Sequence, residues 1–167
     1  MDDPVLNRRS IRKYTGDPVD DETVERLLRA AMAAPSAGNQ QPWEFVVLRA
    51  RATLRAIPEF HPYAKMLPDA PVAILVCGAP GRAKWPQMWE QDCSAATENL
   101  LIEAELLGLG AVWLGAHPLG ERVEALRALL GIPETVVPFA VVSLGWPAEH
   151  KEPSDRFDAA RVHVERW

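Results

Sequence analysis

Apolar positions along the chain predict alternating helices and strands. In the segment 20–32 they recur at helical spacing and form one stripe: Val24, Leu27, Leu28, Ala31 and Met32. A continuous apolar run at 72–77 predicts a buried central strand. The other expected elements are strands at 43–48, 111–114 and 138–144, and helices from Pro4 and at 50–57, 91–107 and 119–130. Because helices and strands alternate, periodicity alone favours a doubly wound α/β fold.

Two segments depart from this regular pattern. The loop 35–42 combines small residues, amides and two prolines, so it continues neither a helix nor a strand. The last twenty residues are polar and irregular, yet they carry Val162, Val164 and Trp167. We expect this tail to dock, either on its own core or on a partner.

Composition and charge narrow the possible classes of protein. The 167 residues are 48% hydrophobic and 25% charged, which is typical of one globular domain, residues 1–167. No apolar stretch is long enough to span a bilayer, and no signal-peptide pattern opens the chain, so we expect a cytoplasmic protein without a membrane partner. The net charge of −5 disfavours nucleic-acid binding, which makes the basic cluster at 8–13 stand out as a local site.

Common reactive and nucleotide-binding motifs are absent from the sequence. Cys77 and Cys93 form no CxxC pair and are expected to be buried free thiols. The four histidines lie far apart, so no metal site is expected. Gly108-Leu109-Gly110 follows an expected helix and precedes a strand, the reverse of a Rossmann motif, and no P-loop or GxSxG motif occurs.

Two polar segments remain as candidate chemistry. In an extended segment Arg8, Ser10 and Arg12 point to one side, where two guanidinium groups and a hydroxyl suit a phosphate. The alternative is a solvated basic turn. The loop amides of Asn39, Gln40 and Gln41 both donate and accept, which suits the edge of a heterocycle; the alternative is an ordinary polar loop.

Taken together, these segments make the chain similar to a known family. It resembles the nitroreductase family of FMN-dependent oxidoreductases, and the resemblance is carried mainly by residues 8–14, 34–43 and 107–115, in that order. It implies an α+β fold: a mixed central sheet flanked by helices in three layers, α/β/α, in an interlocked homodimer. The mixed sheet replaces the parallel sheet that periodicity suggests. FMN would lie in the subunit interface.

The resemblance also implies which residues bind FMN. The phosphate and ribityl chain would be bound by Arg8, Arg9, Ser10 and Arg12. The isoalloxazine ring would be contacted by a loop of the partner subunit, through Pro35, Ser36, Ala37, Asn39 and Gln41. Backbone amides near the flavin N5 come from Trp113, Leu114 and Gly115; some members have glutamate in place of Gly115. Arg156 completes the phosphate site, although Ser154 and Asp155 stand where a second basic residue is common. Lys65 reaches the pyrimidine oxygens, unless it is a surface lysine.

The implied reaction needs no catalytic side chain, since FMN does the chemistry. NADH or NADPH would donate hydride, and nitroaromatics, quinones or free flavins would accept it at the same face, in a ping-pong mechanism. His117 would touch the acceptor, unless it is a solvent-facing loop histidine. Trp85, Met88 and Trp89 would roof the substrate site, with core or dimer packing as the alternative.

Three other functions are compatible with parts of this pattern. Relatives with the same fold fragment flavin or remove halogen from aromatic rings. A flavin-binding protein without enzymatic activity would show the same cofactor segments. A nucleic-acid module built on the basic segment is disfavoured by the net charge of −5.

Overall fold

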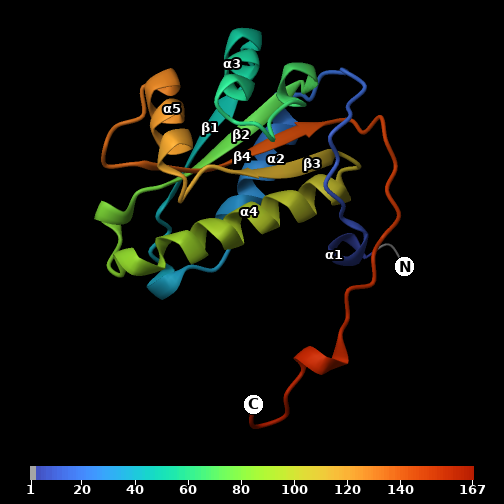
Figure 1. Cartoon of the computed structure of the whole chain (residues 1–167), viewed down its shortest axis with the longest axis vertical. Helices are drawn as coiled ribbons and strands as arrows, with labels where there is room; N and C mark the ends of the chain where they lie inside the picture. Colours follow the sequence, from blue (N-terminus) through green and yellow to red (C-terminus); the bar gives the residue numbers. More distant parts are fainter. Residues whose placement is uncertain (1–2) are drawn as a thin grey trace.

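The computed structural model describes residues 3–167, which form three layers (Figure 1). The central sheet has the order β1-β2-β4-β3. Its strands are β1 (Trp43–Leu48), β2 (Val72–Gly78), β3 (Gly110–Gly115) and β4 (Val137–Gly145). In Figure 1, α3 (Arg51–Ala56) and α5 (Gly120–Leu130) lie above the sheet, and α4 (Trp89–Leu106) lies beneath it. The helix α2 (Asp21–Met32) packs against α4 on that lower face.

The sheet confirms the α+β class and shows that the doubly wound α/β fold is wrong. All three neighbouring pairs of named strands are antiparallel. The one parallel contact in the described part of the chain is a single bridge between Ser10 and Ala111. Apolar runs mimic parallel strands here because helices cover both faces of β2, whose seven residues are all buried.

The two faces of β2 contribute to two separate hydrophobic cores. Val72, Ile74 and Val76 join the cluster that packs on α2 and α4. The alternate residues join the cluster under α3 and α5: Ala73, Leu75 and Cys77. Because side chains alternate between faces with a period of two, one strand serves both cores. This double packing produces the α/β/α layers expected for the fold.

Most helix boundaries follow the capping residues in the sequence. Asp3 accepts from the backbone of Val5 and Leu6 and begins α1 (Pro4–Asn7), and Asp20 caps α2 through the backbone of Thr23. Gly131 ends α5 with φ +66°, the left-handed conformation that glycine adopts easily. The helix expected at 91–107 instead begins at Trp89, so α4 starts before its expected first residue and includes this tryptophan.

The stripe expected on α2 is only partly buried. Val24, Leu27 and Ala31 are buried, whereas Met32 is 50% exposed. The buried stripe therefore ends at Ala31, one residue earlier than expected, just before the loop 35–42.

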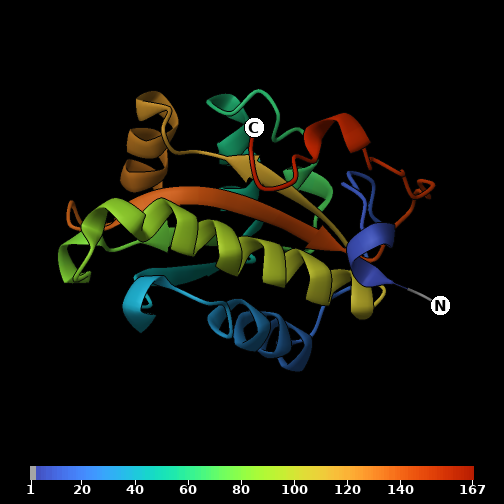
Figure 2. The ribbon, with the colours of Figure 1, turned by 90° about the horizontal axis from the view of Figure 1, so that it is seen from below.

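The C-terminal tail leaves the body of the protein. After β4 the chain passes close to α1 and then runs away from the three layers (Figures 1 and 2). Its large apolar side chains are exposed: Phe157, Val162, Val164 and Trp167. Docking of this tail on its own core, one of two alternatives raised by the sequence, is therefore wrong. Among the described residues, no helix is both long and apolar enough to cross a membrane.

Candidate functional site

The arginine segment, defined as residues 8–12, runs along the outer edge of β3. Ser10 bridges to Ala111, and the amide of Ile11 donates to Ala111 O at 2.9 Å. Ile11 is buried against Gly110, where any Cβ atom would overlap its side chain. With Ile11 turned inward, its neighbours Ser10 and Arg12 turn away from the core, as the alternation in an extended segment requires.

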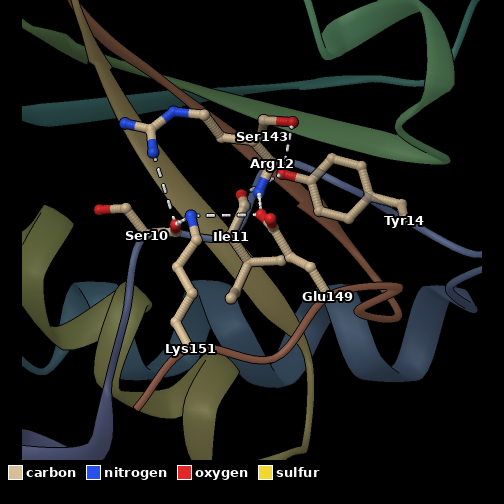
Figure 3. Close-up of polar contacts among 7 residues, drawn as sticks. All are labelled: Ser10, Ile11, Arg12, Tyr14, Ser143, Glu149 and Lys151. Atoms are coloured by element: carbon tan, nitrogen blue, oxygen red, sulfur yellow. Dashed lines mark hydrogen bonds and ion pairs between the residues drawn. The ribbon is translucent and has the colours of Figure 1, made fainter. Parts of the chain in front are cut away.

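Side chains from β4 and the following residues hold the backbone of this segment (Figure 3). Glu149 Oε1 accepts from the Arg12 amide at 2.6 Å, and Lys151 Nζ donates to Ser10 O at 2.6 Å. Glu149 and Lys151 are themselves paired at 3.3 Å. The Arg12 amide, the Lys151 ammonium and its other neighbours hold the pKa of the Glu149 carboxyl below its ordinary value. We call this pair the backbone clasp.

Tyr14 extends the hold on the segment into the core. Its hydroxyl lies 3.0 Å from Ile11 O and 2.9 Å from Ser143 Oγ (Figure 3). Burial raises the pKa of Tyr14 to about 12, so the hydroxyl keeps its proton and donates to the carbonyl. Consecutive backbone groups from Ser10 O to Arg12 N are thus all bound by the protein itself, so the position of the segment is fixed without a ligand.

The guanidinium groups of the arginine segment open into different cavities. Arg8 lines a cavity of about 590 Å³ together with Arg156. Arg9 lines a second cavity with Lys151, and Arg12 lines a third with Lys65. The convergence of Arg8 and Arg12 on one point, expected from strand alternation, is therefore wrong: the cations are spread along a strip. Lys151, which sequence reasoning missed, joins this strip.

Two nitrogen donors of this strip are buried without an acceptor. Arg8 Nε and Arg9 Nη1 have no hydrogen-bond partner among the described residues. Arg8 Nε lies 3.3 Å from Glu98 Oε1, an ion-pair distance without the geometry of a hydrogen bond. Buried donors without acceptors are rare and costly. Their chemistry fits an anion with several acceptor oxygens, such as a phosphate.

A second part of the site lies at the end of β3. A cavity of about 370 Å³ brings together Arg12, Lys65, the end of β3 and two residues that sequence reasoning missed, His61 and Arg122. This size falls in the range of small-molecule sites, roughly 300–1,000 Å³. Only the folded structure brings His61 and Arg122 together, because they come from different loops and helices and belong to no motif.

The carbonyl of Gly115 is fixed from two sides. His61 Nε2 lies 2.9 Å from Gly115 O, and Arg122 Nη1 donates to the same oxygen at 2.9 Å. His61 is 1% exposed, and burial lowers the pKa of its imidazole. The neutral ring therefore donates from Nε2, while Nδ1 is buried without a partner among the described residues.

β3 offers its backbone, more than its side chains, to this cavity. Leu114 is buried in the core under α3 and α5, and the ring of Trp113 packs on Phe139 at 5.7 Å. β3 is the edge strand, and Ala111 pairs with the arginine segment along its outer edge. Alternate residues direct their amides to the same edge, so Trp113 and Gly115 also face outward.

The loop 35–42 is a tight turn with unusual backbone angles. φ is positive at three positions: Gly38 (+52°), Asn39 (+56°) and Gln41 (+47°). For residues other than glycine this conformation is strained, and such strain clusters at functional sites. Gln41 Nε2 donates to Asn39 Oδ1 at 2.9 Å, and the Gln41 amide donates to Ser36 Oγ at 3.1 Å. Asn39 and Gln41 are exposed, as are Pro35 and Gly38.

Gln40 differs from the other loop amides. Its side chain is bonded to Asp92 and to the backbone of Trp85, so it is not available to the edge of a heterocycle. The hypothesis that all three loop amides face a ligand is therefore wrong for Gln40. The buried Asp92, which also accepts from the Ala37 amide at 2.8 Å, was missed because a single helix carboxylate carries no motif.

The loop 35–42 and the arginine segment lie at opposite ends of α4 (Figures 1 and 2). The loop is bonded to Asp92 in the first turn, whereas Arg8 pairs with Glu98 and the cavity of Arg9 reaches Glu105. One chain therefore does not bring the two segments to a common point.

The residues expected to roof a substrate site have different environments. Trp85 is 36% exposed and lies against Gly38. Trp89 is buried between Gly78 and Phe139, so a core role explains it better than the substrate contact suggested by sequence. His117 lies edge-on to Trp89 at 4.8 Å, with Nε2 3.2 Å from Glu90. It is 23% exposed, so it is not the fully solvent-facing loop histidine of the alternative.

Reactive thiols and metal-ligating clusters do not contribute to this site. Cys77 and Cys93 are buried and free, and burial raises the pKa of each thiol to about 12. Both therefore stay protonated and are poor nucleophiles. No group of three or more possible metal ligands among His, Cys, Asp and Glu occurs within residues 3–167.

Comparison with known proteins gives one consistent result. The model of the nitroreductase family matches residues 5–65 and 55–146. A protein of Archaeoglobus fulgidus, provisionally named NADH dehydrogenase/NAD(P)H nitroreductase, is 53% identical over 98% of this chain and 96% of its own length.

Solved structures agree with the sequence comparison. A crystal structure from Clostridium acetobutylicum, provisionally named NADH oxidase, has a TM-score of 0.95 at 49% identity and covers 99% of this chain and 100% of its own. A nitroreductase-like protein from Desulfovibrio desulfuricans, crystallised with FMN, has a TM-score of 0.83 at 33% identity, covering 100% and 99%. The fold, the arginine segment and these matches lead to one conclusion: the chain belongs to the nitroreductase family.

Proposed function

We propose that this protein is an FMN-dependent oxidoreductase that takes hydride from NADH or NADPH and passes it to electron-poor acceptors. Quinones, nitroaromatics and free flavins are the acceptors we expect. The observation that carries this proposal is the strip along the outer edge of β3. Along this strip lie buried arginine donors without acceptors, then outward-facing backbone amides of β3, and then a cavity of small-molecule size.

The chemistry of this strip fits FMN. Arg8, Arg9 and Arg156 supply donors for a phosphate, and the related protein from Desulfovibrio desulfuricans binds FMN with the same fold. In the strip we assign Ser10 to the phosphate and ribityl part. The cavity of Arg12 and Lys65 is then left for the ring, with Trp113 and Gly115 contributing outward-facing backbone groups. The backbone groups of Leu114 face β4, so the contact expected of Leu114 from the sequence is not part of this proposal.

Bound FMN would supply hydride transfer and electron storage. The chain itself contributes position and charge. Lys65 and Arg12 place two cations at one cavity, where they stabilise negative charge on a ligand. His61 and Arg122 fix the carbonyl of Gly115 and with it the end of β3. No side chain is assigned as a nucleophile, in line with the protonated thiols.

We propose further that the working unit is a homodimer with FMN at the subunit interface. The separation of the arginine segment from the loop 35–42 supports this arrangement, because a second copy supplies the missing loop. Pro35, Ser36, Ala37, Asn39 and Gln41 would then act on the FMN bound to the other protomer. The exposed apolar tail gives the same proposal an independent physical reason.

An absorbance spectrum tests the cofactor. Purified protein should show a flavin spectrum, and the released cofactor should be identified as FMN by mass. A colourless protein that takes up no added FMN would overturn the proposal. Rapid oxidation of NADH or NADPH with a quinone separates an enzyme from a flavin-storing protein.

Steady-state kinetics test the order of reaction. If donor and acceptor use the same face in turn, double-reciprocal plots at several acceptor concentrations should give parallel lines. Intersecting lines would show that both substrates bind together, and the ping-pong mechanism would have to be abandoned.

A further inference from the structure

Asp92 is a buried carboxylate whose partners both lie in the loop 35–42. It is 4% exposed, and its two oxygens accept from the Ala37 amide at 2.8 Å and from Gln40 Nε2 at 2.6 Å. No ion pair of Asp92 occurs within the described part of the chain. A buried carboxylate is costly unless hydrogen bonds replace its water, so loop conformations that break these two bonds are disfavoured.

Gln40 passes this constraint on to Trp85. Its Oε1 accepts from the Trp85 amide at 2.9 Å, and its Nε2 donates to Trp85 O at 3.2 Å as well as to Asp92. The orientation of the amide is thereby fixed, because the reversed group would set N–H against N–H at Trp85. Both backbone groups of Trp85 are held by one side chain of the loop.

The indole of Trp85 completes the contact. It lies so close to Gly38 that a Cβ atom there would overlap the ring. Lys84 Nζ lies 4.5 Å from the centroid of the ring, and Trp85 remains 36% exposed. A partly exposed flat ring therefore sits beside the loop with the Lys84 ammonium over it, and a flat electron-poor molecule would stack on the ring by displacing this flexible side chain.

We propose that Gln40 and Asp92 form a latch that joins Trp85 to the loop 35–42 as one unit and sets selectivity among acceptors through Trp85. Gln40 and Asp92 are positioning residues in this scheme, and neither touches the ligand. The inference rests on the proposed function, in which this loop covers the flavin ring. It goes further by naming the side chain that discriminates flat acceptors and the pair that holds it.

A hydrogen-bond swap tests the latch. Asp92→Asn sets an amide N–H against Gln40, and Gln40→Glu sets a carboxylate against Asp92, so each single change breaks the bond. In the double variant, the new amide at position 92 donates to the new carboxylate at position 40 and still accepts from the Ala37 amide. That carboxylate still accepts from the Trp85 amide, but it has no proton to donate to Trp85 O, so this bond is lost and two oxygens face each other there. Gln91→Glu, on the exposed side of the same helical turn, is the control for added charge.

Two electron acceptors distinguish an effect on the position of Trp85 from a general loss of activity. A naphthoquinone stacks on a flat surface, whereas ferricyanide accepts electrons without stacking. Each single variant should raise KM for the quinone about tenfold, the loss expected for one hydrogen bond to a charged group, with a much smaller change for ferricyanide. The double variant should recover part of this loss relative to Gln40→Glu, because the bond between positions 40 and 92 is restored while the contact with Trp85 O stays broken. Trp85→Leu should reproduce the loss of the single variants and add little to Asp92→Asn.

Hydrogen exchange provides a second test of the latch that does not require enzymatic turnover. Amide hydrogen exchange at residues 36–41 and 85–88 should speed up in both single variants and slow again in the double variant. Additive effects in the double variant, or an unchanged quinone-to-ferricyanide ratio in the single variants, would overturn the latch. If wild-type protein binds no FMN, the proposed function fails, and with it the role in selectivity. Hydrogen exchange would then still decide whether the pair joins loop and tryptophan.

Discussion

At the scale of single residues, the cations of the strip have different surroundings. Arg8 shares a cavity with Arg156 and holds a buried donor without an acceptor, whereas Arg12 shares a cavity with Lys65 at the end of β3. The sequence suggested one phosphate grip for both arginines. Because the two arginines line different cavities, we propose a phosphate role for Arg8 and a role near the flavin ring for Arg12.

This division predicts different defects in two alanine variants. Arg8→Ala should raise the Kd for FMN by roughly 10- to 100-fold, because charge-assisted hydrogen bonds are lost. Arg12→Ala should mainly lower kcat/KM per bound flavin. Flavin fluorescence titration and kinetics normalised to bound flavin measure the two effects. Arg26→Ala, which removes an exposed arginine of α2, controls for charge. Identical defects in both variants would contradict the division.

His61 predicts a loss of stability in acid. Its folded-state pKa is lowered by burial, so the unfolded chain takes up a proton first as the pH falls. The stabilisation is complete above the ordinary histidine pKa of about 6.5 and is lost below it. The free energy of unfolding in urea should therefore fall between pH 7.5 and 5. His61→Gln should flatten this fall, and His150→Gln, at an exposed position, should leave it intact.

At the scale of elements, the docking of the arginine segment on β3 positions the residues that we propose bind the phosphate. Gly110 permits that docking, because its missing Cβ leaves room for Ile11. The backbone clasp and Tyr14 then hold the segment from the other side. A displacement of Ile11 from Gly110 would therefore move all the cations of the strip together.

Gly110→Ala should therefore weaken FMN binding indirectly, although residue 110 itself does not contact the cofactor in the proposed site. The added methyl group pushes Ile11 off the strand edge, which should raise the Kd for FMN about tenfold and destabilise the fold by about 1–3 kcal/mol. Fluorescence titration and urea unfolding measure the two changes. Gly120→Ala is the matched control, since a Cβ atom at Gly120 meets nothing within 4 Å. Equal FMN affinity in both variants would contradict this role.

Elements and their ends were largely predictable from the sequence, and their arrangement was not. Caps such as Asp20 and Gly131 act locally, so they mark boundaries well. The direction of neighbouring strands is not encoded in periodicity when both faces of a sheet are buried. Asp92 and His61 depend on contacts across more than fifty residues of sequence, and no local pattern marks them.

At the scale of the whole molecule, the site is divided between distant parts of the chain. The arginine segment and the loop 35–42 lie at opposite ends of α4, and the tail extends from the body with Trp167 fully exposed. Large exposed apolar residues gathered in one segment are typical of an interaction surface. The proposed homodimer would account for both features.

Removing the tail after Arg156 should weaken the dimer and the binding of FMN together. The deletion keeps Arg156 but removes the exposed residues Phe157, Val162, Val164 and Trp167, whose burial in the proposed interface would supply hydrophobic stabilisation. Sedimentation should show a shift toward monomer, and flavin content should fall in parallel. Arg161→Ala and Arg166→Ala, which keep the apolar residues, should remain dimeric. A monomer that retains full FMN would refute the interface model.

The two buried thiols have a consequence for durability. When dioxygen collects electrons from a reduced flavin, hydrogen peroxide results, and peroxide attacks thiolates. Cys77 and Cys93 have pKa values of about 12 and no access to solvent, so at neutral pH they present almost no thiolate to this oxidant. If the proposed enzyme loses electrons to dioxygen in this way, its two thiols should resist the peroxide formed beside them.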